Sequence, residues 1–176
     1  KYPSKLWTTN LRYKWSNCRH KNSPVTTDVR SDLRPGSIME LQAVALELNR
    51  NFEYTPDGWT RLFDSIDTPA GAWERAFNPG PLRDDCDGFH AALYWAASKK
   101  MACFLLTLVT ANIKDSHTLL CVKITDSYYF VDYTYISGGY SKLDTLVKDI
   151  RKRRGMGEIL LVEKSVYHNG WQTMEG

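Results

Sequence analysis

The spacing of hydrophobic residues along the chain changes from helical to strand-like near Lys100. Before this point, apolar residues recur every three or four positions, as they do on one face of a helix. Ser37 and Thr68 are placed to cap two of these helices, and Asp84 or Asp85 to cap a third. The helices predicted from this pattern cover residues 38–48, 60–66, 69–77 and 86–97.

After Lys100 the apolar segments are short and rich in β-branched and aromatic residues, which is typical of strands. The predicted strands cover residues 102–110, 118–125, 128–133 and 158–163. Asp126 and Ser127 form a tight turn that joins the second and third strands as a hairpin. A helix capped by Ser141 and ended by Gly155 separates the third and fourth strands. Helices followed by a mainly antiparallel sheet place the chain in the α+β class.

The composition fits a single globular domain over residues 1–176. Hydrophobic residues make up 43% of the chain and charged residues 24%, both ordinary values for such a domain. Residues 1–36 lack periodicity and contain many turn-forming residues. We therefore expect an irregular N-terminal arm, packed on the core through Trp7, Tyr13 and Trp15.

Charge and hydropathy narrow the functional classes. The net charge of +3 is too small to favour a nucleic-acid partner. No apolar run approaches the length needed to cross a membrane. The first residues lack the hydrophobic region of a signal peptide, which favours a cytoplasmic location. No pattern points to a particular oligomeric state.

The four cysteines lie in different settings. None forms a Cys-x-x-Cys pair, so neither a metal site nor a cofactor is expected. Cys103 and Cys121 lie in apolar strands and are predicted to be buried free thiols. Cys18 lies close to His20, which is only a weak metal-binding pattern. Cys86 differs from the others because charged residues surround it.

Cys86 lies at the predicted start of a helix, where a cysteine can act as a nucleophile. Unpaired N–H groups and the helix dipole favour the thiolate there, and the same groups can stabilise an oxyanion on an attacked acyl group. His117 and Asp132 lie on the two strands of the hairpin, which brings them to one edge of the sheet. We therefore predict a triad with Cys86 as nucleophile, His117 as base and Asp132 as the residue that orients the base.

The residues around these positions resemble the transglutaminase-like cysteine protease superfamily. The resemblance lies in Arg-Asp-Asp-Cys-Asp-Gly-Phe (83–89), Ser-His-Thr (116–118) and Tyr-Phe-Val-Asp-Tyr-Thr (129–134), and extends over residues 68–135. It implies a papain-like core in which the Cys helix packs on an antiparallel sheet, and thiol chemistry on an acyl group. The chain departs from the family pattern at Asp84, Gly88 and His90, where a glycine, an acidic residue and a small residue are usual.

These observations predict a cysteine peptidase or amidohydrolase that forms an acyl-enzyme on Cys86 from a protein or peptide substrate. Two alternatives stay open. The acyl group can pass to an amine instead of water, as in transglutaminase-type crosslinking, or the fold can serve as a catalytically weak binding module. The sequence does not specify the residues that bind substrate. A second oxyanion donor is expected upstream of Cys86, with Trp59 and Asn51 as candidates.

Other polar residues near the nucleophile have a second interpretation. His90 lies one turn further along the helix and is an alternative base, although no carboxylate is placed to orient it. Asp84, Asp85 and Asp87 can form a metal site, but helix capping is the simpler role. The basic run at residues 151–154 can bind phosphate, or can complement the C-terminal end of a helix dipole.

Overall fold

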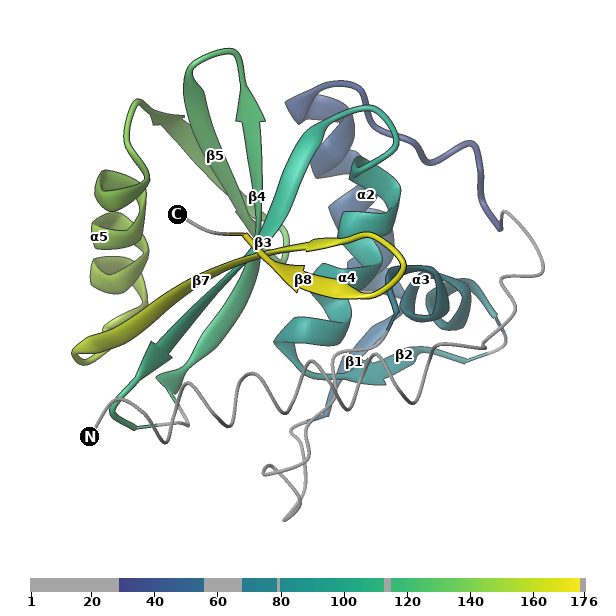
Figure 1. Cartoon of the computed structure of the whole chain (residues 1–176). Helices are drawn as coiled ribbons and strands as arrows, with labels where there is room; N and C mark the ends of the chain where they lie inside the picture. The colour runs from purple at the N-terminus through teal and green to yellow at the C-terminus, as the bar shows by residue number, and fades with distance from the viewer. Residues whose placement is uncertain (1–28, 56–67, 79, 113–114, 175–176) are drawn as a thin grey trace.

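The computed structural model has an α+β fold (Figure 1) and describes residues 29–55, 68–78, 80–112 and 115–174. The helices are α2 (Ile38–Arg50), α3 (Pro69–Phe77), α4 (Cys86–Ala97) and α5 (Leu143–Arg154). The strands are β1 (Phe52–Tyr54), β2 (Leu82–Asp84), β3 (Ala102–Thr110), β4 (His117–Ile124), β5 (Ser127–Asp132), β6 (Tyr135–Tyr140), β7 (Ile159–Tyr167) and β8 (Trp171–Thr173). None of the described helices is long and apolar enough to cross a membrane.

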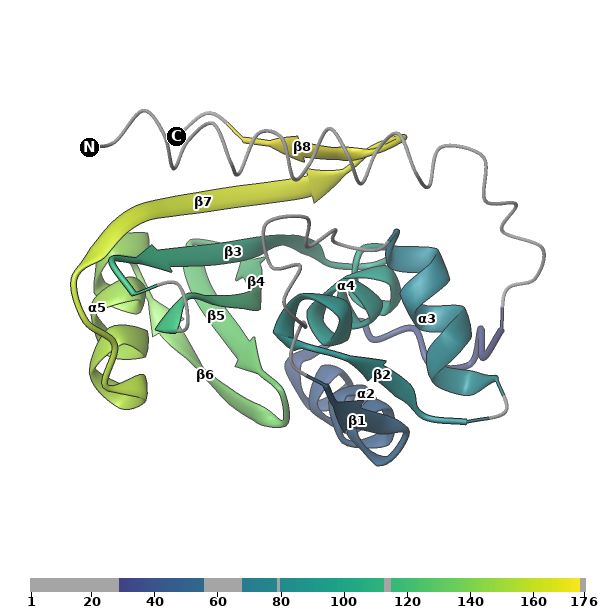
Figure 2. The same cartoon turned by 90° about the horizontal axis from the view of Figure 1, so that it is seen from below.

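One antiparallel sheet dominates the described part of the chain. Its strand order is β6-β5-β4-β3-β7-β8, and β1 and β2 form a separate parallel pair. Helix α5 covers one face of the large sheet, whereas α2, α3 and α4 lie on the other side (Figures 1 and 2). The sheet therefore separates the helix that carries Cys86 from the basic helix α5.

Alternate residues of the central strands face opposite sides of the sheet, as strand geometry requires. Leu105 and Leu120 belong to the hydrophobic cluster that includes α4. Leu106 and Leu119 belong to the second cluster, together with Leu146 of α5. All five side chains are inaccessible to solvent, so α4 and α5 are each fixed against the sheet by apolar packing.

Local capping explains where three of the helices begin. The Ser37 hydroxyl accepts a hydrogen bond from the N–H three residues on at 3.2 Å, and the Thr68 hydroxyl does the same at 3.1 Å. Asp85, rather than Asp84, caps α4 through a 3.0 Å bond from the N–H of Asp87. These bonds satisfy N–H groups that have no partner inside the helix, so the predicted starts are confirmed.

The hairpin between β4 and β5 turns one residue earlier than predicted. Ile124 pairs with Ser127, so Thr125 and Asp126 form the turn. Thr125 adopts a left-handed φ of 53°, as two-residue hairpin turns commonly require. The first strand of the hairpin also begins one residue earlier than predicted, at His117, which pairs with Leu108 in the sheet.

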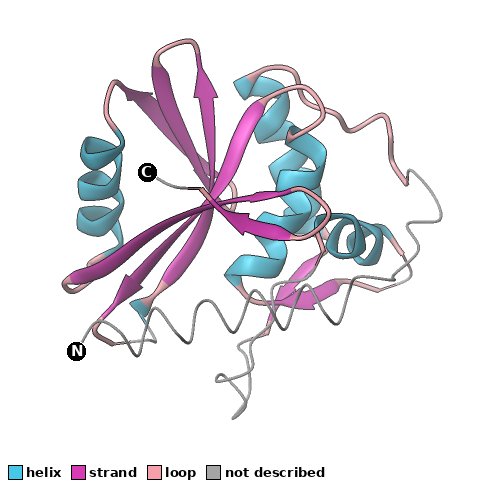
Figure 3. Cartoon of the chain, viewed as in Figure 1, coloured by secondary structure: helices cyan, strands magenta, loops and turns pink. Residues whose placement is uncertain are grey.

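Other predicted elements also need correction (Figure 3). Lys142, rather than Ser141, is the N-cap of α5, and it forms no side-chain cap bond. Strand β7 is longer than the predicted residues 158–163. Strands β1, β2 and β8 were not predicted because three residues are too few to show a period. Strand β6 contains two glycines, which disfavour a strand assignment.

Some predictions concern residues outside the described part of the chain. These are the helix at residues 60–66 and the contacts of Trp7, Tyr13 and Trp15. Of the predicted irregular arm, residues 29–36 are described, and they contain neither a helix nor a strand.

Candidate functional site

Cys86 is the first residue of α4, at the point where the chain leaves β2. Asp85 precedes it in an extended conformation and caps the helix. The Cys86 side chain is partly exposed. Its thiol therefore lies at the positive end of the helix dipole and remains accessible, which is the setting of a reactive cysteine.

The main-chain N–H of Thr118 contacts the Cys86 sulfur, with an N···Sγ distance of 3.5 Å. Thr118 directly follows His117 in β4. Helix α4 also packs against β3 and β4. The structure thus confirms that Cys86 begins a helix packed on the sheet that contains both His117 and Asp132.

His117 and Asp132 form a hydrogen-bonded pair at one end of the sheet. The distance from His117 Nε2 to Asp132 Oδ1 is 2.9 Å. The pairing of Leu120 with Val131 places the two residues diagonally on adjacent strands. Their side chains are only 6% and 13% exposed. Because Nε2 is engaged by the carboxylate, Nδ1 is the ring nitrogen left for a reacting group.

Arg154, the last residue of α5, holds the same carboxylate. Its Nε and Nη2 atoms lie 2.6 Å from Oδ2 and 2.6 Å from Oδ1 of Asp132, which is a bidentate ion pair. In the sequence, this arginine stands out only as part of the basic run 151–154. Its place in the site depends on how α5 packs on the sheet, and no local pattern records that packing.

These contacts determine the charge state of the pair. Burial would raise the pKa of Asp132, but hydrogen bonds from His117 and Arg154 outweigh it and hold that pKa well below its usual range. Burial lowers the pKa of His117, the Asp132 hydrogen bond opposes this, and the charge of Arg154 lowers it further. The net result is a pKa below the ordinary value, which favours a neutral imidazole that can accept a proton.

His90 is fully buried, and both of its ring nitrogens have partners. Nδ1 lies 2.5 Å from the carbonyl oxygen of Cys86, and Nε2 lies 3.1 Å from the main-chain nitrogen of Tyr133. A carbonyl only accepts and a main-chain N–H only donates, so these partners assign the neutral tautomer with its proton on Nδ1. Burial, and then the charge of His117, lower the pKa of His90 to about 3. His90 therefore links α4 to the end of β5 and is poorly suited to act as the base.

A cleft of about 650 Å³ gives access to the cysteine and the histidine. Its lining comes from α2 and β1 on the helical side, and from the end of α5 and the segment before β4. The lining residues are Asn49, Phe52, Tyr54, Cys86, Asp115, Ser116, His117, Tyr133, Arg154, Gly155 and Met156. A ligand in this cleft can reach the nucleophile and the base together.

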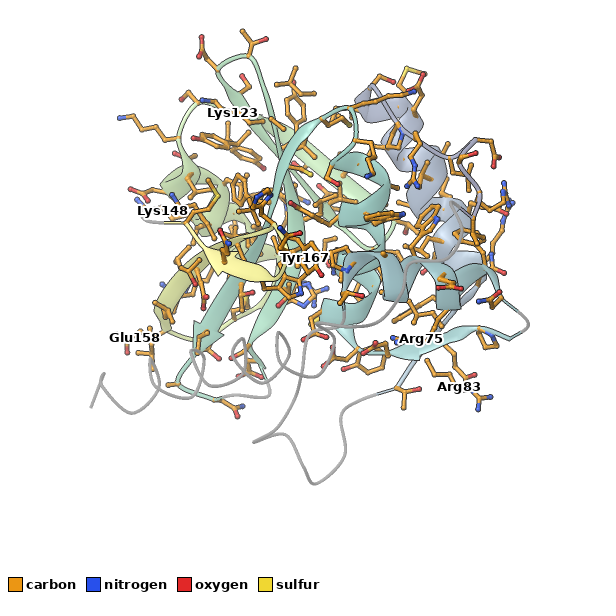
Figure 4. The ribbon with its side chains drawn as sticks, turned by 45° about the vertical axis from the view of Figure 1, so that its right-hand side comes forward. Arg75, Arg83, Lys123, Lys148, Glu158 and Tyr167 are labelled. Carbon is orange, nitrogen blue, oxygen red and sulfur yellow. The ribbon has the colours of Figure 1, made fainter. Side chains whose placement is uncertain are left out.

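Asp84 and Gly88, two of the departures from the family pattern, lie against each other in the structure. A Cβ atom on Gly88 would overlap the carboxylate of Asp84. That carboxylate accepts hydrogen bonds from Arg75 at 3.2 Å and from the N–H of Asp85 at 2.9 Å. Figure 4 labels Arg75 on the helical side of the molecule. Gly88 therefore leaves the space that Asp84 occupies beside the start of α4.

The acidic residues before and after Cys86 come close together, with oxygen atoms of Asp84, Asp85 and Asp87 within 4.8 Å of one another. Two of them have roles within the fold. Asp84 is paired with Arg75, and Asp85 caps α4. These contacts favour the capping interpretation of the acidic cluster.

Of the two candidates for a second oxyanion donor, Asn51 does not supply one. Asn51 is the C-cap of α2, and its side-chain amide donates to the Glu47 carbonyl at 3.0 Å. It is not among the described residues that line the cleft. Trp59 lies outside the described residues.

The remaining cysteines differ from Cys86 in their surroundings. Cys103 and Cys121 are free thiols, as predicted, but only Cys121 is fully buried and Cys103 is partly exposed. Burial raises the pKa of Cys103 to about 12 and also raises that of Cys121, so both are poor nucleophiles near neutral pH. Cys18 and His20 lie outside the described residues.

Comparison with known proteins adds no assignment to this geometry. No protein-family model matches the sequence, and no curated protein or solved structure is significantly similar to the chain.

Proposed function

We propose that the chain carries out thiol-dependent acyl chemistry on an amide substrate, as a cysteine peptidase or amidohydrolase. One observation carries the proposal: the sulfur of Cys86 at a helix start contacts the strand that begins with His117, and His117 is paired with Asp132. A nucleophile, a base and a residue that orients the base thus share one end of the sheet. The same order of roles occurs in cysteine and serine hydrolases on unrelated folds.

In the proposed reaction, His117 takes the thiol proton of Cys86 on its free Nδ1. The sulfur forms a bond to the substrate carbonyl carbon, and the carbonyl π electrons move to the oxygen. When the tetrahedral intermediate collapses, the bond to the leaving amine breaks and His117 returns the proton to that amine. Water then attacks the thioester and His117 accepts its proton. When this second tetrahedral intermediate collapses, the C–S bond breaks, the carboxylic acid leaves and His117 returns the proton to the Cys86 sulfur.

Asp132 and Arg154 support His117 without contacting the substrate carbonyl. Asp132 fixes the ring orientation and stabilises the imidazolium that forms during the reaction. Arg154 keeps the carboxylate ionised and opposes the positive charge on the histidine. This opposition keeps the base neutral before attack, which fits a general-base reaction better than a permanent thiolate–imidazolium pair.

The resemblance to transglutaminase-like cysteine proteases supports the same reading. It rests on the motif residues around Cys86, His117 and Asp132, and on a helix packed across an antiparallel sheet. We extend the proposal to a papain-like core on this basis. The cleft of about 650 Å³ is large enough for a short peptide segment, so the proposed substrate is a protein or peptide.

The test is whether an acyl group accumulates on Cys86. The chain is incubated with a panel of activated peptide esters and thioesters, and the adduct is located by peptide mapping. We expect the adduct on Cys86 and none on Cys103 or Cys121, which serve as internal control thiols. Cys86→Ala abolishes the adduct, and His117→Ala slows its formation strongly.

The outcome also separates hydrolysis from transfer. Release of the free acid in water identifies a hydrolase, whereas capture of the acyl group by an added primary amine in preference to water identifies a transferase. If Cys86 reacts no faster than an ordinary exposed thiol with every ester and thioester, the chain is not a thiol acyl enzyme. That result favours a binding module on this fold.

A further inference from the structure

Tyr133 lies directly after Asp132, and its backbone is in the left-handed region with a φ of 53°. This conformation is unusual for a bulky residue. Its main-chain N–H is held by His90 at 3.1 Å. Residues in sparsely populated backbone regions persist where their surroundings fix them, and they concentrate at functional sites.

The Tyr133 ring is packed between side chains from both sides of the cleft. Its centroid lies 5.9 Å from that of Phe52 and 5.0 Å from that of Phe89. It also lies 5.2 Å from His90 and 6.1 Å from His117. These contacts leave the ring little freedom, so the direction of its hydroxyl is fixed.

Tyr133 lines the same cleft as Cys86. Within the described part of the chain, it has no hydrogen-bond partner. Burial raises the pKa of Tyr133, and the negative charge of a Cys86 thiolate raises it further. The phenol is therefore neutral throughout the physiological range and keeps its proton available for donation.

We propose that the Tyr133 hydroxyl is the second donor to the oxyanion that forms when Cys86 attacks an acyl carbon. The inference rests on the proposed function and names a residue for the role that Asn51 does not fill. During attack, the S–C bond forms and the carbonyl π electrons move to oxygen. Tyr133 donates a hydrogen bond to that oxygen and keeps its proton, and the N–H groups at the start of α4 donate from the other side.

Two reactions of the same sulfur separate this role from a structural one. Acylation by a p-nitrophenyl ester passes through a tetrahedral oxyanion. Alkylation by iodoacetamide is a direct displacement at a saturated carbon and forms no oxyanion. Both need His117 to take the proton of the same Cys86 sulfur, so the ratio of the two rates isolates the effect on the oxyanion.

The experiment compares Tyr133→Phe with the unmodified chain in both reactions. Phenylalanine keeps the ring and its packing and removes one oxygen atom. We expect acylation to fall about 100-fold or more, the usual effect of removing one oxyanion donor, whereas alkylation changes by less than about 3-fold. Tyr135→Phe is the matched control, because Tyr135 lies two residues away, is 43% exposed and does not line this cleft.

Three results would overturn the inference. If neither reaction of Tyr133→Phe changes, the hydroxyl does not take part. If both rates fall by the same factor, the hydroxyl acts on the thiolate and not on the oxyanion. If the unmodified chain is alkylated at Cys86 but never acylated, the proposed function fails and this inference with it, a failure visible before any Tyr133 variant is made.

Discussion

Arg154 and Asp132 form a bidentate ion pair, with nitrogen–oxygen distances of 2.6 Å and 2.6 Å. The same carboxylate also binds Nε2 of His117. One buried charge is therefore shared between a permanent cation and a titratable base. This sharing makes the end of α5 part of the site, although Arg154 is far from Cys86 in the sequence.

Replacing Arg154 with methionine should raise the pKa of His117. Burial still lowers that pKa, and Asp132 still raises it, but the opposing cation is gone. Asp132 is 13% exposed and loses its bidentate partner, so we also expect unfolding to require about 1–2 kcal/mol less free energy. Imidazole NMR measures the pKa, and urea denaturation measures the stability.

Arg153→Met is the matched control, because Arg153 pairs with Asp149 and not with Asp132. It should leave the His117 titration where it is. An unchanged His117 titration in the Arg154 variant would show that the arginine only anchors α5.

Asp132→Asn should keep the fold and lower acylation of Cys86 by about 10- to 1000-fold. Asparagine has nearly the same shape, but it lacks the charge that stabilises the imidazolium. The acid limb of iodoacetamide alkylation should move to lower pH, because the pKa of His117 falls without the carboxylate and the base stays neutral over a wider pH range. Stopped-flow acylation and a pH series of alkylation measure both effects. If neither changes, Asp132 is a structural hairpin residue and the triad reduces to a Cys86–His117 dyad.

Acid should destabilise the fold through its buried histidines. The folded-state pKa of His90 is about 3, below the ordinary 6.5, and that of His117 is also lowered. The unfolded chain therefore binds protons that the folded chain does not. Above about pH 6.5 the two histidines are neutral in both the folded and the unfolded chain, and the protein keeps its full stability. As the pH falls below this value, the unfolded chain takes up protons, and the free energy of unfolding drops by about 1.4 kcal/mol per pH unit for His90 alone.

Chemical denaturation between about pH 7 and about pH 5 tests this linkage. In that range Asp132 contributes little to the slope, because its unfolded pKa of 3.8 lies lower. His90→Asn keeps a donor for the Cys86 carbonyl but does not titrate, so its stability should depend less steeply on pH. An identical slope in the variant would mean that His90 is protonated in the folded protein.

Gly88→Ala should destabilise the protein, against the usual preference of helices. Helix propensity alone predicts a gain of about 1 kcal/mol. The added Cβ would instead overlap the carboxylate of Asp84, which is held by Arg75 and by the N–H of Asp85. We expect a net loss of about 1–3 kcal/mol in the free energy of unfolding.

A double-mutant cycle with Asp84→Gly separates the two effects. Without the Asp84 side chain, Gly88→Ala should become neutral or stabilising, and the cycle should show a coupling of at least about 1 kcal/mol. A Gly88→Ala variant that is more stable than the parent, with no coupling, would show that the two positions are independent.

The sequence by itself determined the local features of the fold. Ser37 and Thr68 were placed correctly as helix caps, and Asp85 was one of two candidates for the third, because a cap bond joins residues only two or three positions apart. The hairpin brought His117 and Asp132 together for a similar reason, since a short turn fixes which residues of two strands are neighbours. The turn itself was misplaced by one residue, which shifts the pairing by two residues. Asp132 consequently lies two residues from the position opposite His117, closer than the predicted turn implies.

Tertiary structure alone decided what surrounds these residues. Arg154 reaches Asp132 only because α5 packs on the opposite face of the sheet from α4, and His90 joins Cys86 to Tyr133 only because α4 lies against the end of β5. Such contacts depend on how buried apolar faces pack against residues far away in the sequence. The spacing of apolar residues shows which face of a helix or strand is buried, but it does not show what that face packs against. The charge state of the triad and the cleft beside it therefore follow from packing, whereas the order of Cys86, His117 and Asp132 along local elements follows from the sequence.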